Sequence, residues 1–299
     1  MRARIVRRLV LAVMLGVAVL SLPDSTQAPT DVELVRIRAA QSVGASDRVV
    51  WILAVGSDAR PGQPMNRSHG DALQLVGINP RTRAATAIGV PRDSWVTIPG
   101  HGRNKINSAL VFGGPKAMAA AVSRLIGITP DYVFVSRFEF FEQMVDDIGG
   151  ISVQNPRTFS DPYLRKRGFR QGRIRLNGFE AMAFSRIRKS LPRGDFDRSA
   201  NQQRTLRGIH RRIHSNAKRP GFIDRGVLTV LQHTSTNLRP GELFRLAQLV
   251  AQVEPGKITT CVIGGGVGWV GPQSVVFPDV LQARRLGRDA RRDARISRC

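Results

Sequence analysis

Residues 49–58 read Val-Val-Trp-Ile-Leu-Ala-Val-Gly-Ser-Asp, an apolar run that ends in a glycine, a serine and a carboxylate. Such a run of β-branched and aliphatic residues is typical of a strand buried on both faces of an α/β sheet. Asp58 follows this strand at its carboxyl end, where open α/β sheets tend to place ligand-binding groups. The stretch therefore predicts a central strand with a functional side chain at its end.

Other apolar runs predict strands and helices in mixed order. The runs 72–78 and 84–90 are joined by Asn79-Pro80-Arg81-Thr82, which is typical of a hairpin-like connection. Shorter strands are predicted at 95–98 and 132–135, and apolar residues at helical spacing predict helices at 115–125, 138–148, 178–185 and 199–218. Because strands and helices follow each other in both orders, we expect an α/β domain with a mixed sheet.

The N-terminal segment predicts a membrane anchor. Four arginines among the first eight residues precede an apolar stretch at 9–22, which is typical of a positive-inside flank and a membrane-entry segment. The best cleavage site ends at Ala28, but Pro29 follows it and favours an uncleaved anchor. We therefore expect a single-pass protein of the cell membrane, with residues 1–22 as flank and signal anchor and the remainder extracytoplasmic.

The remainder is expected to comprise a polar linker at 23–48, one large domain at 49–283 and an arginine-rich tail at 284–299. The tail holds seven Arg and two Asp, and a solvated helix or a disordered end is expected there. Cys261 and Cys299 are the only cysteines of the chain. They could pair in an oxidising compartment, but their spacing leaves this open.

The charge balance indicates an anionic partner. The chain carries 46 basic and 22 acidic residues, a formal net charge of +24, and residues 157–225 alone hold 19 basic and 5 acidic ones. Nucleic acid, anionic lipid and phosphorylated substrates all fit, but an extracytoplasmic domain makes nucleic acid a poor candidate. The sequence has no P-loop, no Gly-x-Ser-x-Gly elbow and no metal-binding cysteine pattern, so nucleotide hydrolysis has no support.

Residues 186–203 form the strongest candidate phosphate site. They read Arg-Ile-Arg-Lys-Ser-Leu-Pro-Arg-Gly-Asp-Phe-Asp-Arg-Ser-Ala-Asn-Gln-Gln, and Arg186 and Arg188 are placed to grip one phosphate or two neighbouring ones. Asp195 and Arg198 flank the start of the helix that follows.

Two further residues of this segment have alternative roles. Asp197 is expected to cap the helix. Gln202 falls on the inward face of the helix, where its amide needs partners. Those partners lie either in a neighbouring loop or in a wet, charged cavity.

Carboxylates and cations also follow the predicted strands. Asp71 precedes a strand expected to run opposite to the first, so Asp58 and Asp71 could meet at one end of the sheet and hold Mg²⁺, although such residues are more often turn or cap residues. Arg92 leaves the sheet at the same end; alone, it would be interpreted as a surface salt-bridge partner of Asp93. Lys105 lies in a polar loop that could add a donor.

Taken together, these motifs resemble the LytR-CpsA-Psr family over about residues 49–215. The stretches that carry the resemblance are Leu53-Ala-Val-Gly-Ser-Asp58-Ala-Arg60, Gly70-Asp71, Val90-Pro-Arg92-Asp93-Ser94, Lys105-Ile-Asn107-Ser-Ala109, Phe112-Gly-Gly114 and the arginine, aspartate and glutamine pattern of 186–203. The chain departs from the usual pattern at Asp197, where the family has glycine.

The resemblance implies a three-layer α/β/α domain with an apolar groove for a polyprenyl chain. It also implies transfer of a phosphorylated glycan from a polyprenyl-pyrophosphate carrier to peptidoglycan. By position, Asp58 and Asp71 would hold Mg²⁺, with Mn²⁺ as an alternative. The residues implied for the pyrophosphate and the catalytic steps are Arg92, Lys105, Arg186, Arg188 and Gln202 as ligands, Arg198 as support, and Asp195 to position or deprotonate the acceptor hydroxyl.

The main alternative is a membrane-anchored protein that binds a polyprenyl-phosphate lipid or an anionic polymer without turnover. A pure binder would need no metal, so Asp58 and Asp71 distinguish the two hypotheses. A membrane-linked regulator acting on DNA is disfavoured by the expected topology and by the absence of a recognisable base-reading helix.

Overall fold

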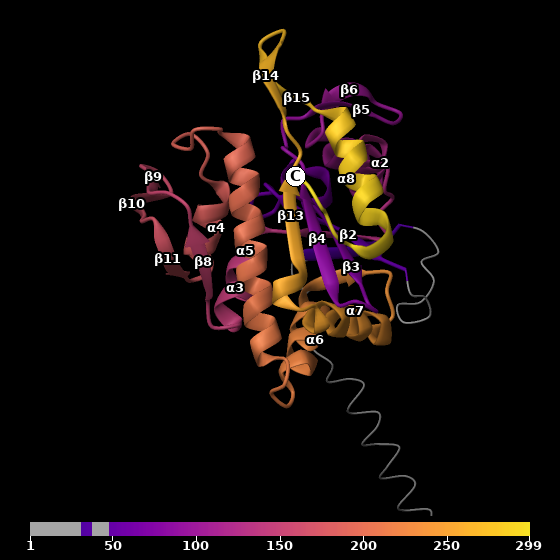
Figure 1. The fold of residues 1–299 in the computed structure, drawn as a ribbon, viewed down its shortest axis with the longest axis vertical. Coiled ribbons are helices and arrows are strands. Elements are labelled where there is room, and N and C mark those ends of the chain that lie inside the picture. The colour runs from indigo at the N-terminus through magenta and orange to yellow at the C-terminus, as the bar shows by residue number, and fades with distance from the viewer. Residues whose placement is uncertain (1–30, 38–47) are drawn as a thin grey trace, which may run out of the picture. The chain divides into compact units, whose positions relative to one another are not determined.

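A seven-stranded sheet forms the centre of the fold in the computed structural model, which describes residues 31–37 and 48–299 (Figure 1). The predicted anchor at 1–22 lies outside the described residues. The sheet contains three parallel and three antiparallel pairs, so the predicted mixed sheet is confirmed. In spatial order the strands are β12 (Thr234–Thr236), β1 (Val32–Arg36), β7 (Tyr132–Ser136), β2 (Val50–Ser57), β3 (Gly70–Asn79), β4 (Ala84–Gly89) and β13 (Ile258–Val262).

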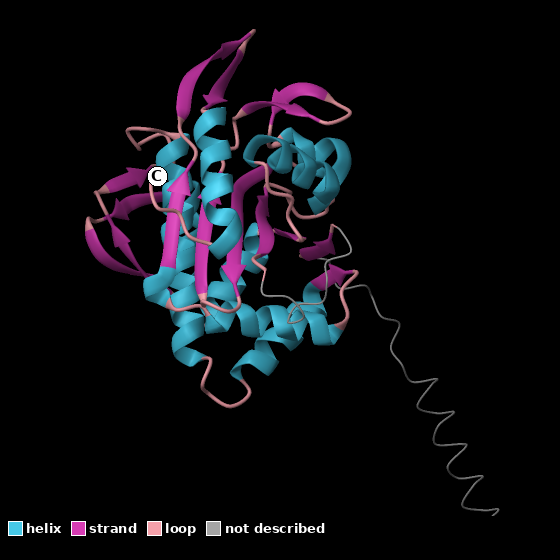
Figure 2. Cartoon of the chain, turned by 45° about the vertical axis from the view of Figure 1, so that its right-hand side comes forward, coloured by secondary structure: helices cyan, strands magenta, loops and turns pink. Residues whose placement is uncertain are grey.

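Helices cover both faces of this sheet, which gives three layers (Figures 1 and 2). Trp51, Leu53 and Val55 of β2 pack in one apolar cluster with residues of α2 (Ser108–Ile126) and α8 (Val280–Asp293). Alternate β2 residues, Val50 and Ile52, pack in a second cluster with residues of α6 (Phe222–His233) and α7 (Pro240–Gln252). The prediction that residues 49–55 form a strand buried on both faces is therefore confirmed.

Helix α2 shows how local sequence signals set helix boundaries. Gly113 and Gly114 interrupt it with non-helical backbone, and Pro115 begins the regular part, as its place near a first turn predicts. Gly127 ends the helix in the left-handed conformation at φ 87°. By length and hydropathy α2 could cross a membrane, but 56% of its most apolar window is buried inside the protein, as is typical of a core helix.

Smaller elements surround the sheet. Helices α3 (Phe138–Asp147) and α4 (Gly178–Arg186) share a third apolar cluster with β8 (Ile151–Asn155) and β11 (Gly172–Leu176). Helix α5 (Asp195–Asn216) joins this cluster to the main sheet through its packing on β8 and β13. The remaining elements are η1 (Met65–Arg67), β5 (Trp95–Ile98), β6 (Gly102–Lys105), β9 (Phe159–Asp161), β10 (Arg165–Phe169), η2 (Pro255–Lys257), β14 (Gly265–Val270) and β15 (Gln273–Pro278).

The expected linker at 23–48 contains a strand of the central sheet. β1 lies between β12 and β7, and its Val32 and Leu34 are buried. The domain therefore begins before residue 49, and the predicted boundary is wrong. A five-residue strand with two inward side chains is too short to stand out in a polar stretch.

The arginine-rich tail also belongs to the domain, contrary to the expected solvated helix or disordered end. Leu286 and Ala290 of α8 and Ala294 beyond it are fully buried in the main cluster. Gly287 lies so close to α2 that an added Cβ would fall 2.2 Å from the carbonyl oxygen of Ile126. The small residues Gly287, Ala290 and Ala294 let α8 and the residue after it pack closely in the core. Their apolar pattern is hard to recognise among the arginines of the same segment.

Two arginine hydrogen bonds and a disulfide hold this end of the chain in place. Arg284 and Arg291 donate to the carbonyl oxygens of Arg124 and Gly127 at the end of α2. Cys261 of β13 and Cys299 form a disulfide with a Cα–Cα distance of 5.3 Å, which answers the question that their spacing left open.

The disulfide is expected to stabilise the fold measurably. Because it closes a separation of 38 residues, its reduction should lower the free energy of unfolding by about 2–4 kcal/mol. Urea unfolding of the full chain with and without reductant measures this difference. Cys299→Ser is the matched control, since reductant should then have no further effect. Equal stability of the wild type in both conditions would contradict the expectation.

Candidate active site

The strands around β2 bring several predicted site residues to one end of the sheet. Ser57 pairs with Gly70, so Asp58 at the end of β2 and Asp71 near the start of β3 are neighbours across this edge. Asp58 is tied to the next loop, because its backbone N–H donates to the His69 carbonyl and its Oδ1 accepts from the His69 N–H. Arg92 follows β4 at the same end, and its carbonyl accepts from the Asn107 N–H.

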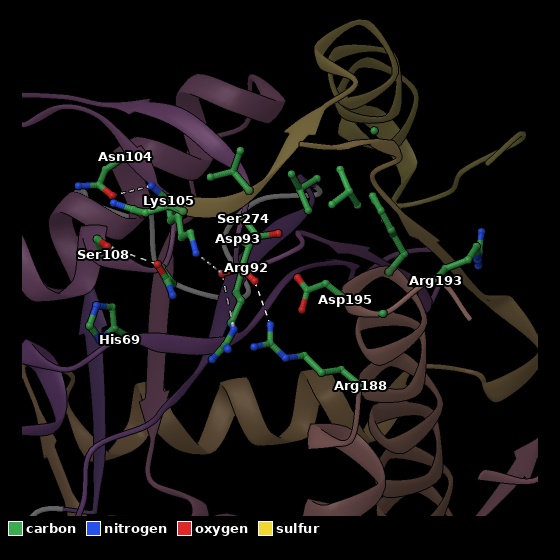
Figure 3. A pocket seen from close by; sticks show the side chains of 18 of the residues that line it. His69, Arg92, Asp93, Asn104, Lys105, Ser108, Arg188, Arg193, Asp195 and Ser274 are labelled. Atoms are coloured by element: carbon green, nitrogen blue, oxygen red, sulfur yellow. Dashed lines mark hydrogen bonds and ion pairs between the residues drawn. The ribbon is translucent and has the colours of Figure 1, made fainter. Parts of the chain in front are cut away.

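Two cavities meet at this end of the sheet. The first, here called the mouth, has a volume of about 1280 Å³ and a charged lining that includes Arg92, Asp93, Lys105, Arg188 and Asp195 (Figure 3). The second, here called the groove, has a volume of about 510 Å³. Its lining is mainly apolar and comes from β2, β3, α3, α5, α6 and α7, with polar side chains at Asp71, Arg186, Arg198 and Gln202.

An ion pair between Arg92 and Asp71 joins the two cavities, since Arg92 lines the mouth and Asp71 lines the groove. The side chains are only 18% and 9% exposed. Burial alone would lower the pKa of Arg92, but the charges of Asp71, Asp93 and Asp195 together raise it. Arg92 therefore remains charged. On the groove side, Arg186 Nη2 lies 4.0 Å from Asp71 Oδ2 and its guanidinium lies 4.2 Å from the ring centroid of Phe138.

Asp93 is the carboxylate that organises the cations of the mouth. Its Oδ2 accepts from Arg188 Nη1 at 3.0 Å, and its Oδ1 lies 3.4 Å from Lys105 Nζ and 3.9 Å from Arg92 Nε (Figure 3). From the sequence, Asp93 was interpreted as a surface salt-bridge partner of Arg92, and no role in binding or catalysis was predicted for it. Its position directly after Arg92, within the motif at 90–94, was the available signal. The structure separates Arg188 in the mouth from Arg186 at the groove.

Asp195 and Arg198 form a buried ion pair on the first turn of α5. Their side chains are 8% and 5% exposed. Burial raises the pKa of Asp195 and lowers that of Arg198, and each partner's charge opposes the shift of the other. Neither Asp195 oxygen accepts a hydrogen bond within the described part of the chain, so Arg198 is its main electrostatic support. Figure 3 shows the Asp195 carboxyl group facing into the mouth, near Asp93 and Arg188.

The side-chain amide of Gln202 is hydrogen-bonded to other protein groups, so the first of its two expected alternatives, structural partners, applies. Its Oε1 accepts from Gln74 Nε2 at 3.1 Å, and its Nε2 donates to the Ser185 carbonyl at 3.3 Å. A longer bond of 3.5 Å reaches the backbone carbonyl of Asp71. The amide therefore connects α5 with β3 and α4 beside the groove.

Asp197 does not cap the helix in the way the sequence predicted. α5 begins four residues before the predicted start, with Gly194 at the N-cap. Asp197 is buried and accepts from both the backbone N–H and Nε of Arg193, at 3.1 and 3.0 Å. Arg157 Nη1 lies 3.8 Å from it. Its charge is thus engaged by two arginines, and it fixes the loop before α5, which lines the mouth.

The groove also contains one ionisable ring that burial keeps neutral. Burial and the nearby His214 lower the pKa of His210 to about 4. At neutral pH this side chain adds no charge to the apolar lining.

The two predicted metal ligands have suitable chemistry but do not form a complete cage. Asp58 is one-third exposed and lines the mouth, whereas Asp71 lines the groove and is paired with Arg92. Among residues 31–37 and 48–299 no group of three or more His, Cys, Asp or Glu is placed to hold a metal ion. Carboxylate oxygens fit a hard divalent cation, but most of its ligands would have to come from water and a bound phosphate.

Comparison with known sequences identifies a family. The model of the LytR_cpsA_psr family matches residues 23–290. A Bacillus anthracis protein named polyisoprenyl-teichoic acid–peptidoglycan teichoic acid transferase TagU is 34% identical over 197 residues, 65% of this chain and 62% of that protein. A Bacillus subtilis protein of the same name is 36% identical over 160 residues, 53% of this chain and 50% of that protein. The chain thus spans less than two thirds of the length of these curated relatives.

Solved structures share the fold. Bacillus subtilis TagV superposes with a TM-score of 0.66 and 26% identity, covering 81% of this chain and 97% of that one. Bacillus subtilis TagU gives a TM-score of 0.59 at 26% identity, covering 81% and 94%. The family match includes β1 and most of α8, which lie wholly and largely outside the expected domain at 49–283. With the family model spanning most of its length, the chain belongs to the LytR_cpsA_psr family.

Proposed function

We propose that this protein is a phosphotransferase that moves a phosphorylated glycan from a polyprenyl-pyrophosphate carrier to peptidoglycan. The observation that carries the proposal is the junction of an apolar groove and a charged mouth at the Arg92–Asp71 ion pair. A lipid-linked glycan has the same three parts, an apolar chain, a pyrophosphate and a polar polymer. The printed names of the relatives, polyisoprenyl-teichoic acid–peptidoglycan teichoic acid transferases, support this class of reaction.

In the proposed complex the polyprenyl chain lies in the groove and the glycan in the mouth. The pyrophosphate then lies beside Arg92, with Arg186 on the groove side and Arg188 and Lys105 on the mouth side. Arginine suits this place because its planar guanidinium can donate two parallel hydrogen bonds to a phosphate. Gln202, whose amide is already bonded to Gln74 and Ser185, contributes by holding α5 rather than by direct contact.

The proposed reaction is a displacement at phosphorus. The acceptor hydroxyl oxygen attacks the phosphorus that bears the glycan, and the bond from this phosphorus to the bridging oxygen breaks. Polyprenyl phosphate leaves, and a phosphodiester links glycan and peptidoglycan. Asp195 faces the mouth with a raised pKa and accepts the hydroxyl proton, while the arginines stabilise charge on the leaving phosphate.

Asp58 and Asp71 would hold Mg²⁺, or Mn²⁺ in its place, together with phosphate oxygens of the donor. When bound, the ion would neutralise charge on the pyrophosphate. Membrane attachment through residues 1–22, with the domain outside the cytoplasm, would bring the groove within reach of a carrier lipid.

The activity is tested with the full chain in detergent, a polyprenyl-pyrophosphate-linked glycan, peptidoglycan fragments and Mg²⁺. Polyprenyl phosphate and a glycan phosphodiester should appear together. If neither product forms with several glycans while the lipid binds tightly, the protein is a carrier-lipid or anionic-polymer binder instead.

Arg92→Ala is expected to reduce transfer by about 100-fold or more, because it removes a donor aimed at the reacting phosphates. Donor affinity should fall as well, since the cation also binds the ground state. Arg92→Lys should restore charge without the paired geometry, giving an intermediate rate. Arg285→Ala, an exposed arginine on α8, is the matched control. Full activity of Arg92→Ala would show that Arg92 has no role in the proposed reaction.

Asp195→Asn is expected to separate catalysis from binding. Transfer should fall by about 100-fold because the proton acceptor is lost. Donor affinity should hold or increase, since a negative charge leaves the mouth. In the wild type, transfer should decline as pH falls through the raised pKa of Asp195, at a higher pH than for an ordinary aspartate. Unchanged transfer by Asp195→Asn would show that another group accepts the proton of the acceptor hydroxyl.

Metal binding is expected to depend on the pyrophosphate, because the two aspartates alone offer few ligands. Isothermal titration of Mn²⁺ should show weak binding to the free protein and at least tenfold tighter binding with farnesyl pyrophosphate present, after subtraction of Mn²⁺ binding to farnesyl pyrophosphate alone. By linkage, Mn²⁺ should tighten farnesyl pyrophosphate binding by the same factor. Asp58→Asn should remove this coupling; coupling that persists in that variant would place the ion elsewhere.

A further inference from the structure

The β14–β15 hairpin carries an unusual concentration of exposed apolar side chains. Among the described side chains, nine large apolar ones are exposed. Three of these, Val267, Trp269 and Phe277, lie on the hairpin, and Val280 and Leu281 follow it at the start of α8. Val267 and Trp269 are 70% and 71% exposed. Single exposed apolar residues are ordinary, but a cluster on one projecting element is typical of an interaction site. In Figure 1 the hairpin extends beyond the end of β13.

The strand register shows which side chains share a face with Trp269. Trp269 pairs with Ser274 and Val267 pairs with Val276, and side chains directly opposite each other share one face of a hairpin. Val267, Ser274 and Val276 line the mouth, as do Gln273 and Val275 of the opposite face, so the hairpin forms part of the mouth wall. Trp269 lies two residues beyond Val267 on the same face, and its largely exposed side chain extends this wall outward. Figure 3 shows Ser274 at the mouth, above Asp93.

The hairpin is fixed to the site rather than loosely attached. The Val276 N–H donates to the Asp93 carbonyl at 2.9 Å, so β15 is bonded to the residue that organises the cations. On the other face of the hairpin, Phe277 packs over glycine, since a Cβ at Gly268 would fall 2.8 Å from its ring. Phe277 thus has a packing partner within the hairpin, whereas Trp269 remains exposed.

The chemistry of this wall fits a carbohydrate. Residues 265–278 contain no Asp, Glu, Lys or Arg, so the hairpin itself offers no electrostatic attraction to an anionic lipid surface. Neutral polar side chains that suit sugar hydroxyls, Asn104, Gln273 and Ser274, line the mouth beside it. An exposed indole provides a rigid apolar surface for the C–H face of a sugar ring. The hairpin lines the mouth and not the groove, so its occupant is the polar part of the reaction mixture.

We propose that the Val267–Trp269 face of the β14–β15 hairpin binds a sugar ring of the acceptor glycan strand, with Trp269 as its stacking platform. The proposal rests on the proposed transferase function. It assigns the acceptor to the outer wall of the mouth and the lipid-linked donor to the Arg92 side. A sugar stacked on Trp269 would continue inward past Ser274 towards Asp195.

The test uses the full chain in detergent and a soluble tetrasaccharide of alternating N-acetylglucosamine and N-acetylmuramic acid. Isothermal titration measures its affinity for the wild type, Trp269→Ala, Trp269→Phe and Tyr163→Ala. Loss of the indole should weaken binding by about tenfold. Trp269→Phe should keep most of the affinity, because a ring remains. Tyr163 is 90% exposed and lines neither cavity, so its replacement should have no effect.

A kinetic measurement gives a second readout. In the transfer assay Trp269→Ala should raise the acceptor KM by about tenfold while the donor KM and the rate at saturating acceptor stay near the wild type. If Trp269 had a purely structural role, Trp269→Ala would instead lower the stability of the protein or change both KM values. Saccharide binding requires no turnover. An inactive wild type that binds saccharide through Trp269 would therefore overturn the transferase function and leave the sugar-binding wall supported.

Equal saccharide affinity of Trp269→Ala and the wild type would overturn the proposal. If both Trp269→Ala and Leu281→Ala, on the hairpin and at the start of α8, then also adsorb less to vesicles of phosphatidylcholine and phosphatidylglycerol, this surface contacts the membrane instead.

Discussion

The Arg92–Asp71 ion pair is the interaction on which the arrangement of the site depends. It lies where the groove meets the mouth, and both side chains are largely removed from water. Removing one partner from a buried pair leaves the other uncompensated, at a cost of about 3–5 kcal/mol. Asp71 and Asp93 hold Arg92 from two sides, which keeps the cation charged and positioned before any phosphate binds. Such preorganisation would let the protein stabilise developing charge without rearranging during the proposed reaction.

Asp197 illustrates how a buried carboxylate beside the mouth is accommodated by its surroundings. An unpaired carboxylate there would add negative charge beside the proposed pyrophosphate site. In the structure Arg193 and Arg157 engage this carboxylate, and it does not line either cavity. The added charge therefore serves to hold the loop before α5. The arginine-rich composition of this region supplies the partners of this carboxylate.

The sequence predicted features that depend on local periodicity and missed those that depend on distant contacts. β2, β3 and β4 were recognisable as apolar runs, and Arg92 could be assigned to their common end because strand ends in a sheet converge. β1 was missed because a five-residue strand carries little periodicity. α8 was misjudged because alanine and glycine, which permit close packing, have weak hydrophobic signals. Gln202 visibly needed partners, but Gln74 lies 128 residues away and only the fold could identify it.

In the proposed transfer reaction, the division between groove and mouth also explains why acceptor binding needs its own surface. A phosphate at the junction lies partly in a low-dielectric environment, where the arginines act strongly, but the mouth must be wide enough to admit a glycan strand. A wide polar mouth also admits water, which is a competing acceptor for the same phosphorus. The protein can favour transfer over hydrolysis only if binding places the sugar hydroxyl beside Asp195 more often than water occupies that position. Binding energy gained on the outer wall, far from the reacting atoms, is a direct means to achieve this preference.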